Sequence, residues 1–374
     1  MFVDSRAWKL ARIVAPLVAF LFALTSCGSD NTGDEALWTF IDKGGKPVTP
    51  FFHWAFEFSE GLAAVQSGQK WGYINKKGDT KIAFQFDAAY PFSDGLAVVG
   101  VGPRFDQLKK TYIDKSGKVL FPPTFNHLGA FGDGLGAAQQ PIERGGKWGF
   151  VDRSGQFVIP PKFDSAGMFS EGLCAVGFKA PVAFKTGYID RTGKLVIPAR
   201  YSTYTNFKNG VALVSVFRGK GQSDLLQIDK HGNKIRDGWC TSDPCPEQVG
   251  GKWGYKNEKG ELVIAAQYKS IGKQFSEGLA SVMFDNFKCG YINTRGELVI
   301  PATFDGAGTF SDGLAAISLE DQRHWDPGRE QYKRHYGFID RTGKIVIPVK
   351  FQDAKDFRDG IALVQYWEVP RAGN

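Results

Sequence analysis

Seven short turns of this chain carry a carboxylate directly before a glycine, and recurring carboxylates are the first place to look for metal chemistry. The residues are Glu60, Asp94, Asp133, Glu171, Glu277, Asp312 and Asp359. Calcium takes six to eight oxygen ligands, and each of these turns supplies one carboxylate. Acidic residues beside a positive-φ glycine are also typical of tight turns. We therefore expect turn chemistry, also for Asp114, Asp152, Asp190, Asp229 and Asp340.

Other residue types that support catalysis are scattered. The five histidines show no pair with metal-ligand spacing: His53, His127, His231, His324 and His335. No nucleophile elbow and no phosphate loop is present in the sequence. The sequence therefore predicts no catalytic residue, no metal site and no cofactor.

Two of the five cysteines form a candidate disulfide. Cys240 and Cys245 flank the turn-like stretch Thr-Ser-Asp-Pro. In an oxidising compartment this spacing favours a disulfide between them. A redox-active pair is the alternative, disfavoured because the spacing is not Cys-x-x-Cys. Cys174, within an apolar run, and Cys289 are expected to be inert core thiols.

The chain from Trp38 onward is one unit repeated with variation. One anchor is aromatic-Ile-Asp/Asn followed by Gly, as in 150–155, and the other is Phe-x-x-Gly-Leu, as in 169–173. A period near forty residues indicates a repeat architecture in which neighbouring units complete each other's core. The sixth unit, with 237–245 in place of the second anchor, is expected to be truncated.

The fourth unit shows the expected strands. We predict a strand over 147–151, a tight turn over 152–155 and a return strand over 157–159 that Pro160 ends. A short third strand over 163–169 and a fourth, buried strand over 173–176 follow. Four strands in about 38 residues match the size of a propeller blade.

The two ends of the repeats are complementary. The last unit ends on a fourth strand, 361–367, and the first begins on a first strand, 38–42. Pairing them would remove two exposed edges. We predict an all-β fold, a β-propeller-like ring of eight or nine blades, with an open β-solenoid as the alternative.

Lys-Trp-Gly recurs at 70–72, 147–149 and 252–254. Together with the Ile-Pro and Phe-Ser-Glu-Gly-Leu elements, it makes residues 38–367 resemble the WG-repeat (KWG-repeat) family. Cys289, Thr186 and Tyr336 replace the tryptophan in other units. The resemblance implies repeated β modules, often exported, and transfers no catalytic residue.

The first residues resemble a bacterial lipoprotein signal peptide. Arg6, Lys9 and Arg12 precede an apolar run at 13–24, and Leu-Thr-Ser-Cys ends at Cys27. The resemblance implies cleavage before Cys27, lipidation of its thiol and, because Gly28 follows, the outer membrane. An ordinary secretory signal is the alternative. The predicted divisions are a signal peptide at 1–26, a tether at 27–37, the repeat domain at 38–367 and a tail at 368–374.

The longest segments between anchors follow a fourth strand and precede the next first strand. They are 100–110, 140–147, 177–186, 218–224 and 320–335. Even strand numbers place them on one face, and together they are net basic, a composition typical of a surface for anionic partners. The predicted binding residues are Arg104, Lys109, Arg144, Lys179, Arg218, Lys220, Arg323, His324, Trp325, Arg329 and Tyr332.

The sequence leads to one function hypothesis and two alternatives. The chain carries a net charge of +7, and removing the leader leaves it basic. We expect a non-enzymatic protein, anchored in the bacterial envelope through Cys27, that binds an envelope protein or an anionic glycan and no nucleic acid. A structural spacer without a ligand is the first alternative. A propeller-type hydrolase, disfavoured by the absence of paired non-consensus polar residues, is the second.

Overall fold

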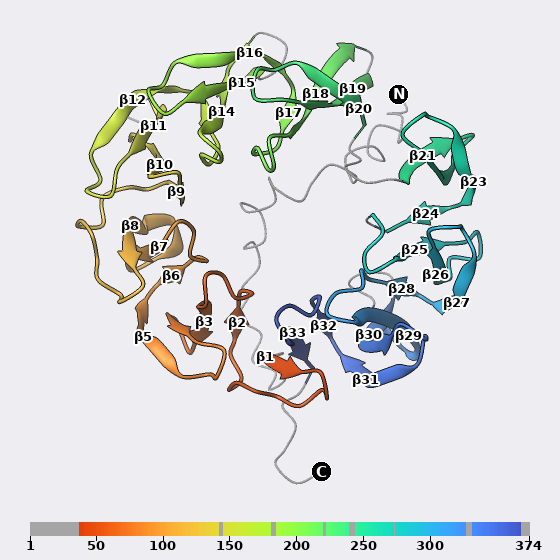
Figure 1. The fold of residues 1–374 in the computed structure, drawn as a ribbon. Helices are drawn as coiled ribbons and strands as arrows, with labels where there is room; N and C mark the ends of the chain where they lie inside the picture. The colour runs from red at the N-terminus through yellow and green to blue at the C-terminus, as the bar shows by residue number, and fades with distance from the viewer. Residues whose placement is uncertain are drawn as a thin grey trace, which may run out of the picture. The chain divides into compact units, whose positions relative to one another are not determined.

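The computed structural model describes residues 37–367, except 142–144, 181–184, 220–221, 239–243, 273 and 327–330. Within these residues the chain is all-β, and the regular elements besides strands are limited to a 3-10 turn at Phe105–Gln107. No helix in the described part is long and apolar enough to cross a membrane. The strands form nine successive sheets, the arrangement of a nine-blade β-propeller (Figure 1). The predicted fold class is confirmed.

The chain divides into two compact units. The middle unit spans residues 92–239 and contains three complete sheets together with strands β7 and β8. Its strands are β7 (Leu96–Val101), β8 (Lys109–Asp114), β9 (Leu128–Gly132), β10 (Leu135–Gln139), β11 (Trp148–Val151), β12 (Phe157–Phe163), β13 (Ser165–Ala166), β14 (Leu173–Phe178), β15 (Lys185–Asp190), β16 (Leu195–Tyr201), β17 (Thr203–Tyr204), β18 (Ala212–Gly219), β19 (Gln222–Ile228) and β20 (Lys234–Asp237). Its four-stranded sheets are β9 to β12, β13 to β16 and β17 to β20, each antiparallel and in chain order.

The terminal unit combines residues 37–91 with residues 240–367. The first part holds β1 (Leu37–Asp42), β2 (Trp54–Ala55), β3 (Ala63–Ser67), β4 (Lys70–Ile74), β5 (Thr80–Phe86) and β6 (Ala88–Ala89). The second part holds β21 (Cys245–Val249), β22 (Lys252–Lys256), β23 (Leu262–Tyr268), β24 (Ser270–Ile271), β25 (Leu279–Met283), β26 (Cys289–Asn293), β27 (Leu298–Phe304), β28 (Gly306–Ala307), β29 (Leu314–Asp326), β30 (Gln331–Asp340), β31 (Ile345–Phe351), β32 (Asp353–Ala354) and β33 (Ile361–Tyr366).

The two ends of the repeat region pair, as predicted. β1 runs antiparallel to β33, from Leu37 opposite Tyr366 to Asp42 opposite Ile361 (Figure 1). The sheet β1-β33-β32 therefore combines the first and last strands of the domain. This pairing satisfies the backbone groups that each strand would otherwise expose at an edge.

The blades are offset from the sequence repeat. Strands β11 and β12 of the fourth unit belong to one sheet, whereas β13 and β14 belong to the next. In that next sheet β14 pairs with β15, which comes from the fifth unit together with β16. The boundary between blades falls between the second and third strands of each unit. Every repeat thus contributes to two consecutive sheets, which ties neighbouring blades together through the chain itself.

Two details of the predicted fourth unit are wrong. Pro160 does not end the return strand, because β12 continues through both prolines to Phe163. β12 is an edge strand that bulges, pairing Phe150 with Ile159 and Trp148 with Phe163. A missing N–H is tolerated at such an edge. The third strand is only the two residues of β13, while the fourth, β14, is buried as predicted and extends to Phe178.

The predicted truncation of the sixth unit appears as a sheet of three strands, β21-β22-β23. The sheets that follow it begin with a two-residue strand, β24 or β28. Within the described residues this leading strand has no counterpart before β21. The missing Phe-x-x-Gly-Leu anchor therefore corresponds to a missing edge strand.

The hydrophobic cores lie between consecutive sheets. One core joins Phe150 and Ile159 to Phe169, Val176 and Ile189 of the next sheet. Buried tyrosines add polar links, since the hydroxyl of Tyr188 donates to the carbonyl of Thr205 at 2.8 Å. Equivalent bonds join Tyr73 to Tyr90, Tyr112 to Gly129 and Tyr291 to Gly308. The buried aromatic side chains thus serve blade-to-blade packing.

Candidate functional site

One side-chain link recurs at the junctions between blades. In four units the lysine before the Trp-Gly position donates to a residue seventeen positions later, as Lys147 does to Asp164 at 2.5 Å. Lys288 binds Asp305, Lys70 binds Asp87 and Lys109 binds Asn126 in the same way. The other oxygen of the aspartate accepts a backbone N–H, from Lys179 at Asp164 and from Glu320 at Asp305. These lysines therefore hold the chain entering the next blade.

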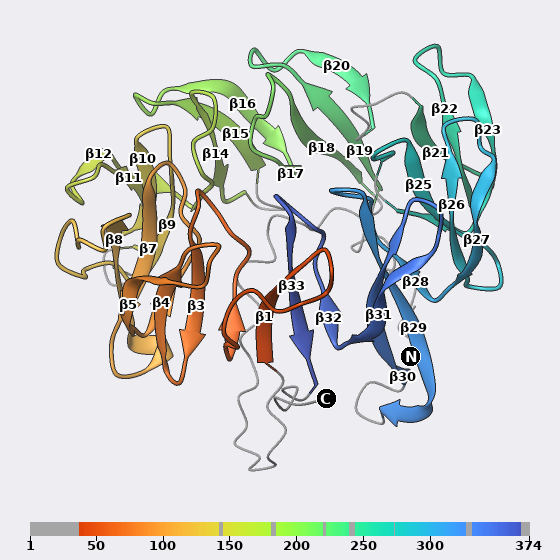
Figure 2. The same cartoon turned by 60° about the horizontal axis from the view of Figure 1, so that its bottom comes forward.

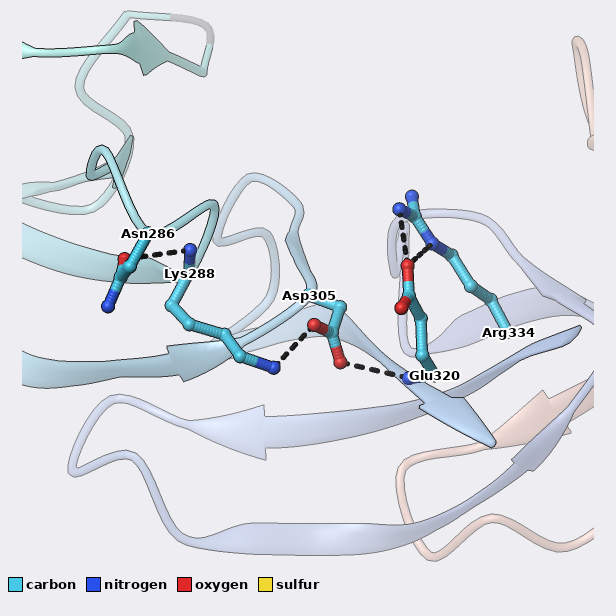
Figure 3. Close-up of polar contacts among 5 residues, drawn as sticks. All are labelled: Asn286, Lys288, Asp305, Glu320 and Arg334. Atoms are coloured by element: carbon cyan, nitrogen blue, oxygen red, sulfur yellow. Dashed lines mark hydrogen bonds and ion pairs between the residues drawn. The ribbon is translucent and has the colours of Figure 1, made fainter. Parts of the chain in front are cut away.

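In the terminal unit this link extends into a chain of polar contacts between two blades (Figure 3). Lys288 reaches Asp305 at 2.5 Å, and Asp305 caps the backbone of Glu320 at 2.9 Å. The carboxylate of Glu320 then accepts from the Arg334 guanidinium at 3.0 and 3.3 Å. The chain connects the 284–288 hairpin loop to the base of the β29–β30 hairpin. We call this region the hairpin pair.

The predicted loop at 320–335 is mostly strand. β29 and β30 stay paired from Leu314 opposite Asp340 to Asp326 opposite Gln331, with one irregularity between Asp321 and Trp325. The hairpin reaches past its neighbours in the terminal unit (Figure 2). The ladder continues beyond the length that the repeat predicts. The prediction of a loop was therefore wrong, and a long hairpin takes its place.

The base of this hairpin is closely packed. Nε2 of His335 lies 3.7 Å from the carboxylate of Asp321, and the His335 ring lies 5.9 Å from that of Trp367. The side chains of Asp321 and His335 are both largely shielded from solvent. These contacts pack the base of the hairpin against the last residues of the repeat region.

A cavity of about 280 Å³ lies beside the base of the hairpin. Ser318, Arg334 and Tyr336 line it from the sheet, and Asp356 lines it from the following segment. Gly308 contributes no side chain to the lining. The equivalent position in the first four-stranded blade holds Phe56, whose ring centroid lies 5.6 Å from that of Trp71. A tyrosine in place of tryptophan and a glycine in place of phenylalanine leave this space open.

The predicted binding residues fall in both compact units. In the middle unit, Arg104 forms an exposed ion pair with Asp106 at 3.3 Å, and Lys179 is exposed at the end of β14. Lys109 donates to Asn126 and so belongs to the recurring blade link. The connections that carry these residues join the second and third strands of their sheets, which are the fourth strand of one repeat and the first strand of the next. Arg144, Lys220 and Arg329 lie outside the described residues, as do the side chains of Arg218, Arg323, His324, Trp325 and Tyr332.

The turn carboxylates have a role that the sequence analysis missed. Five of the seven accept a hydrogen bond from the backbone N–H of the glycine in the following turn. Asp133 binds Gly172 at 2.6 Å and Glu171 binds Gly210 at 2.9 Å. The same contact joins Asp94 to Gly134, Glu277 to Gly313 and Asp312 to Gly360. The carboxylates form a series of turn-to-turn links within each unit.

Basic side chains from the hairpin loops complete this series. Lys230 lies 3.2 Å from Glu171, and Lys76 lies 2.9 Å from Asp359. The hydrogen bond from the Gly210 N–H is the main reason that the pKa of Glu171 lies below its usual value, and the Lys230 ammonium lowers this pKa further. The acidic residue itself adopts a positive φ, near +50°, next to the positive-φ glycine. The expectation of turn chemistry is confirmed.

The second set of aspartates also behaves as predicted. Oδ1 of Asp152 accepts the N–H groups of Ser154 at 2.8 Å and Gln156 at 3.1 Å, and the Ser154 hydroxyl at 2.6 Å. The hydroxyl contact is the main cause of the lowered pKa of Asp152. The same geometry recurs at Asp114, Asp190, Asp229 and Asp340.

The cysteines and histidines offer no assembled site among the residues that the structure describes, where no cluster of three metal-ligating side chains occurs. Cys174 and Cys289 are buried as predicted, and burial raises the pKa of both thiols. Cys245 begins β21. Its predicted disulfide partner Cys240, like the predicted lipidation site Cys27, lies outside the described residues.

Eight segments match the family model described as a WG containing repeat. They span residues 38–71, 71–102, 111–140, 148–177, 187–220, 253–286, 290–322 and 336–366. The chain belongs to the WG-repeat family. No curated protein matches the chain.

Solved propeller structures resemble the WG-repeat chain only distantly. A TolB-like protein from Agrobacterium tumefaciens is 8% identical, with a TM-score of 0.34 over 55% of this chain and 90% of that one. The tricorn protease is 12% identical, with a TM-score of 0.31 over 83% of this chain and 35% of that one. The dihydro-heme d1 dehydrogenase NirN is 12% identical, with a TM-score of 0.38 over 83% and 78%. These values carry no argument about function.

The structure explains the glycine of the WG motif. A Cβ on Gly72 would lie 2.7 Å from the carbonyl oxygen of Ile82 on the opposite strand. At Gly149 it would press into the carbonyl oxygen of Ile159. The bulge at the Ile-Pro element brings that carbonyl toward the WG strand, so a side chain does not fit. The two motifs are therefore parts of one junction.

Proposed function

We propose that this WG-repeat protein is a non-enzymatic recognition module anchored in the bacterial envelope, which binds an envelope protein or an anionic glycan through its strand-2-to-strand-3 hairpins. The observation that carries the proposal is the length of the β29–β30 hairpin. Its ladder continues to Asp326 opposite Gln331, whereas the equivalent β25–β26 ladder ends at Met283 opposite Cys289. A binding role gives a reason for this extension, because insertions at one end of a repeat protein are typical of a contact surface.

The way the extension is held supports recognition rather than a passive connection. Asp305 caps Glu320, Arg334 binds Glu320, and His335 lies beside Asp321 and Trp367. A surface that is already ordered loses less conformational entropy when a partner binds. The contacts at the base thus suit a preorganised binding element.

The recurring chemistry of the turns supports a role without catalysis. The acidic side chains that recur in the turns are engaged with glycine N–H groups and basic side chains, as at Glu171. Such contacts stabilise the fold, and they occupy carboxylate oxygens that a general acid or base would need for proton transfer. The proposal of envelope attachment rests on the resemblance of residues 1–27 to a lipoprotein leader.

The test is capture of cross-linked material from intact cells by the tagged protein with Cys27 retained. Because 320–321 and 334–335 belong to the base of the hairpin, the informative variant replaces residues 322–333 with a two-residue Asn-Gly turn. We expect loss of one enriched envelope protein or glycan. Retention of the same material by the shortened variant, or enrichment of abundant bystanders only, would favour the spacer.

A charge-reversal set tests the electrostatic part. Arg104→Glu, Lys179→Glu and Arg218→Glu are expected to weaken capture, because their connections lie at the hairpin ends of their blades. The matched controls Lys194→Glu and Lys344→Glu reverse exposed cations in the opposite, Asp-containing loops. An equal loss in both sets would show that net charge, rather than the hairpin end, governs capture.

A further inference from the structure

The 284–288 loop presents an exposed phenylalanine in a backbone conformation that favours glycine. Phe287 has a φ of +62° and is 61% exposed, more than any other large apolar residue described. Phe284 N donates to Lys288 O at 3.0 Å, and Phe287 N donates to Phe284 O at 3.0 Å. This is the pattern of a three-residue hairpin loop whose last residue is left-handed.

The same chain shows what this loop type normally requires. Nine other described loops have the identical hydrogen-bond pattern, and each has glycine at the left-handed position: Gly45, Gly78, Gly117, Gly155, Gly193, Gly232, Gly260, Gly296 and Gly343. A bulky residue with a positive φ is strained there. Phe287 is thus the exception in a set of ten otherwise equivalent loops.

The fold gains little from this ring. Its main described contact is with Lys269, whose Nζ lies 3.4 Å from the ring centroid. A cation over an exposed ring contributes modestly to stability. Backbone strain that the local structure does not require is concentrated at functional sites. The positive φ of Phe287 therefore suggests that its ring contacts a partner.

The surroundings define the partner that fits. Phe287 is at the tip of a hairpin, so a partner must be concave to cover the ring. Beside it are Lys269 and the ion pair of Lys252 with Asp285, and Lys288 is bound to Asp305. A buried aromatic anchor surrounded by a polar, charged rim is typical of protein interfaces. A glycan chain offers no pocket for a protruding ring.

We propose that Phe287 is an anchor residue that inserts into an apolar pocket, rimmed by acidic groups, on a partner protein. The proposal rests on the recognition role proposed above and makes it specific: the partner is a protein, and the 284–288 loop of the hairpin pair contacts it. Lys269 orients the ring and faces the acidic rim. The β29–β30 hairpin, joined to the loop through Asp305, supplies the adjoining surface (Figure 3).

The experiment places the photo-cross-linker p-benzoylphenylalanine at position 287 of the full-length chain in its native cells. The matched control carries it at Phe157, an exposed aromatic on edge strand β12. We expect a protein adduct of one mass from position 287 and none from position 157. Lys269→Glu should reduce the adduct at least about tenfold, whereas Lys194→Glu should leave it unchanged.

Three results would overturn the proposal: the same adduct from position 157, a protease-resistant glycan adduct, or no adduct from position 287. If the 322–333 replacement abolishes capture while position 287 gives no adduct, the recognition role stands and this inference fails. If position 287 gives its adduct while that replacement leaves capture intact, the long hairpin is not required and the proposal about Phe287 stands.

A second variant separates binding from folding. Phe287→Gly restores the residue that the nine equivalent loops use, so it should fold with an equal or higher Tm. We expect its affinity for the cross-linked partner to fall at least about tenfold, as for an interface anchor. Unchanged affinity in Phe287→Gly contradicts the proposal even if an adduct forms.

Discussion

Asp133 accepts a 2.6 Å hydrogen bond from the backbone N–H of Gly172, a residue in the turn of the next blade. Ser170, two residues before Gly172, in turn donates to the carbonyl of Phe207 at 2.7 Å in the blade beyond. The Phe-Ser-Glu-Gly-Leu element is therefore more than a local turn. Its serine and its carboxylate both bind the corresponding element of the following repeat.

Removing one of these carboxylates should destabilise the fold without changing the turn. Asp133→Asn keeps a residue that tolerates a positive φ, as Asn209 does in its own turn at +53°. The loss of a charge-assisted hydrogen bond should lower the free energy of unfolding by about 1–2 kcal/mol. Urea unfolding measures the change, with Asp106→Ala, an exposed surface pair with Arg104, as a nearly neutral control. Equal effects of the two variants would refute the link.

Local patterns made the repeat, the four strands and the pairing of β1 with β33 predictable. The anchors recur with a constant order, and antiparallel geometry then sets the position of the ends. The offset between repeat and blade was not predictable, because it depends on which strands pair across units. Pro160 was misread for the same reason, since proline ends a central strand but is tolerated at a bulged edge.

The carboxylate links were missed because their partners are distant backbone groups. Gly172 N–H is 39 residues from Asp133, and a sequence does not show which turns become neighbours. One signal was present. Asn209 stands at the acidic position of its turn, and the unit after it lacks the Phe-x-x-Gly-Leu anchor whose glycine would donate. An amide where the next unit lacks this anchor is consistent with the acid's role.

The glycine of the WG motif should be intolerant of even a methyl group. In Gly149→Ala the new Cβ would press into the carbonyl of Ile159, which belongs to the bulged backbone and has little freedom to move. We expect a loss of about 3 kcal/mol or more in unfolding free energy. Gly129→Ala is the matched control, because its nearest atom would be 3.4 Å away. Similar losses at the two sites would show that the close approach at Gly149 does not explain the motif.

The loop aspartates should make stability fall in acid. Hydrogen bonds from Ser154 and neighbouring N–H groups lower the pKa of Asp152 in the folded state relative to about 3.9 in an unfolded chain. The stabilisation is therefore fully present above the unfolded value and is lost as pH falls through the lower, folded value. Asp152→Asn should flatten this part of the stability curve between about pH 5 and pH 2. Asparagine is native at the equivalent Asn75, where Oδ1 accepts the N–H of Lys77 at 3.0 Å.

That comparison also gives the control. Asp152→Ala removes the acceptor entirely and should lower stability at every pH, whereas Asp152→Asn keeps an acceptor oxygen and should lose, at neutral pH, only the part of the stabilisation that depends on the charge. Denaturant unfolding at a series of pH values distinguishes the two. An unchanged pH dependence in Asp152→Asn would mean that other acids dominate, and the effect should then be sought at Asp190 and Asp340, whose pKa values are also lowered mainly by a threonine hydroxyl.

The disulfide between Cys240 and Cys245 stays a prediction. Thiol titration of denatured, unreduced protein should find Cys174 and Cys289 reactive and leave Cys240 and Cys245 silent until a reductant is added. In the native protein Cys174 and Cys289 should react slowly at pH 8, because both are buried and burial raises their pKa values. Four reactive thiols in the denatured, unreduced protein would remove the disulfide.

Asp305 should matter more than its lysine partner, because it performs two tasks. It binds Lys288 with one oxygen and caps the backbone of Glu320 with the other. Lys288→Met removes one contact, and a partly exposed ion pair contributes up to about 1 kcal/mol. Asp305→Ala also leaves the Glu320 N–H without its acceptor at the base of the β29–β30 hairpin, so we expect about 1–2 kcal/mol more destabilisation.

Hydrogen exchange at Glu320 provides the decisive measurement: the amide should exchange faster in Asp305→Ala and remain protected in Lys288→Met. Equal protection in both variants would show that the ladder between β29 and β30, rather than Asp305, orders the hairpin on which the recognition proposal depends.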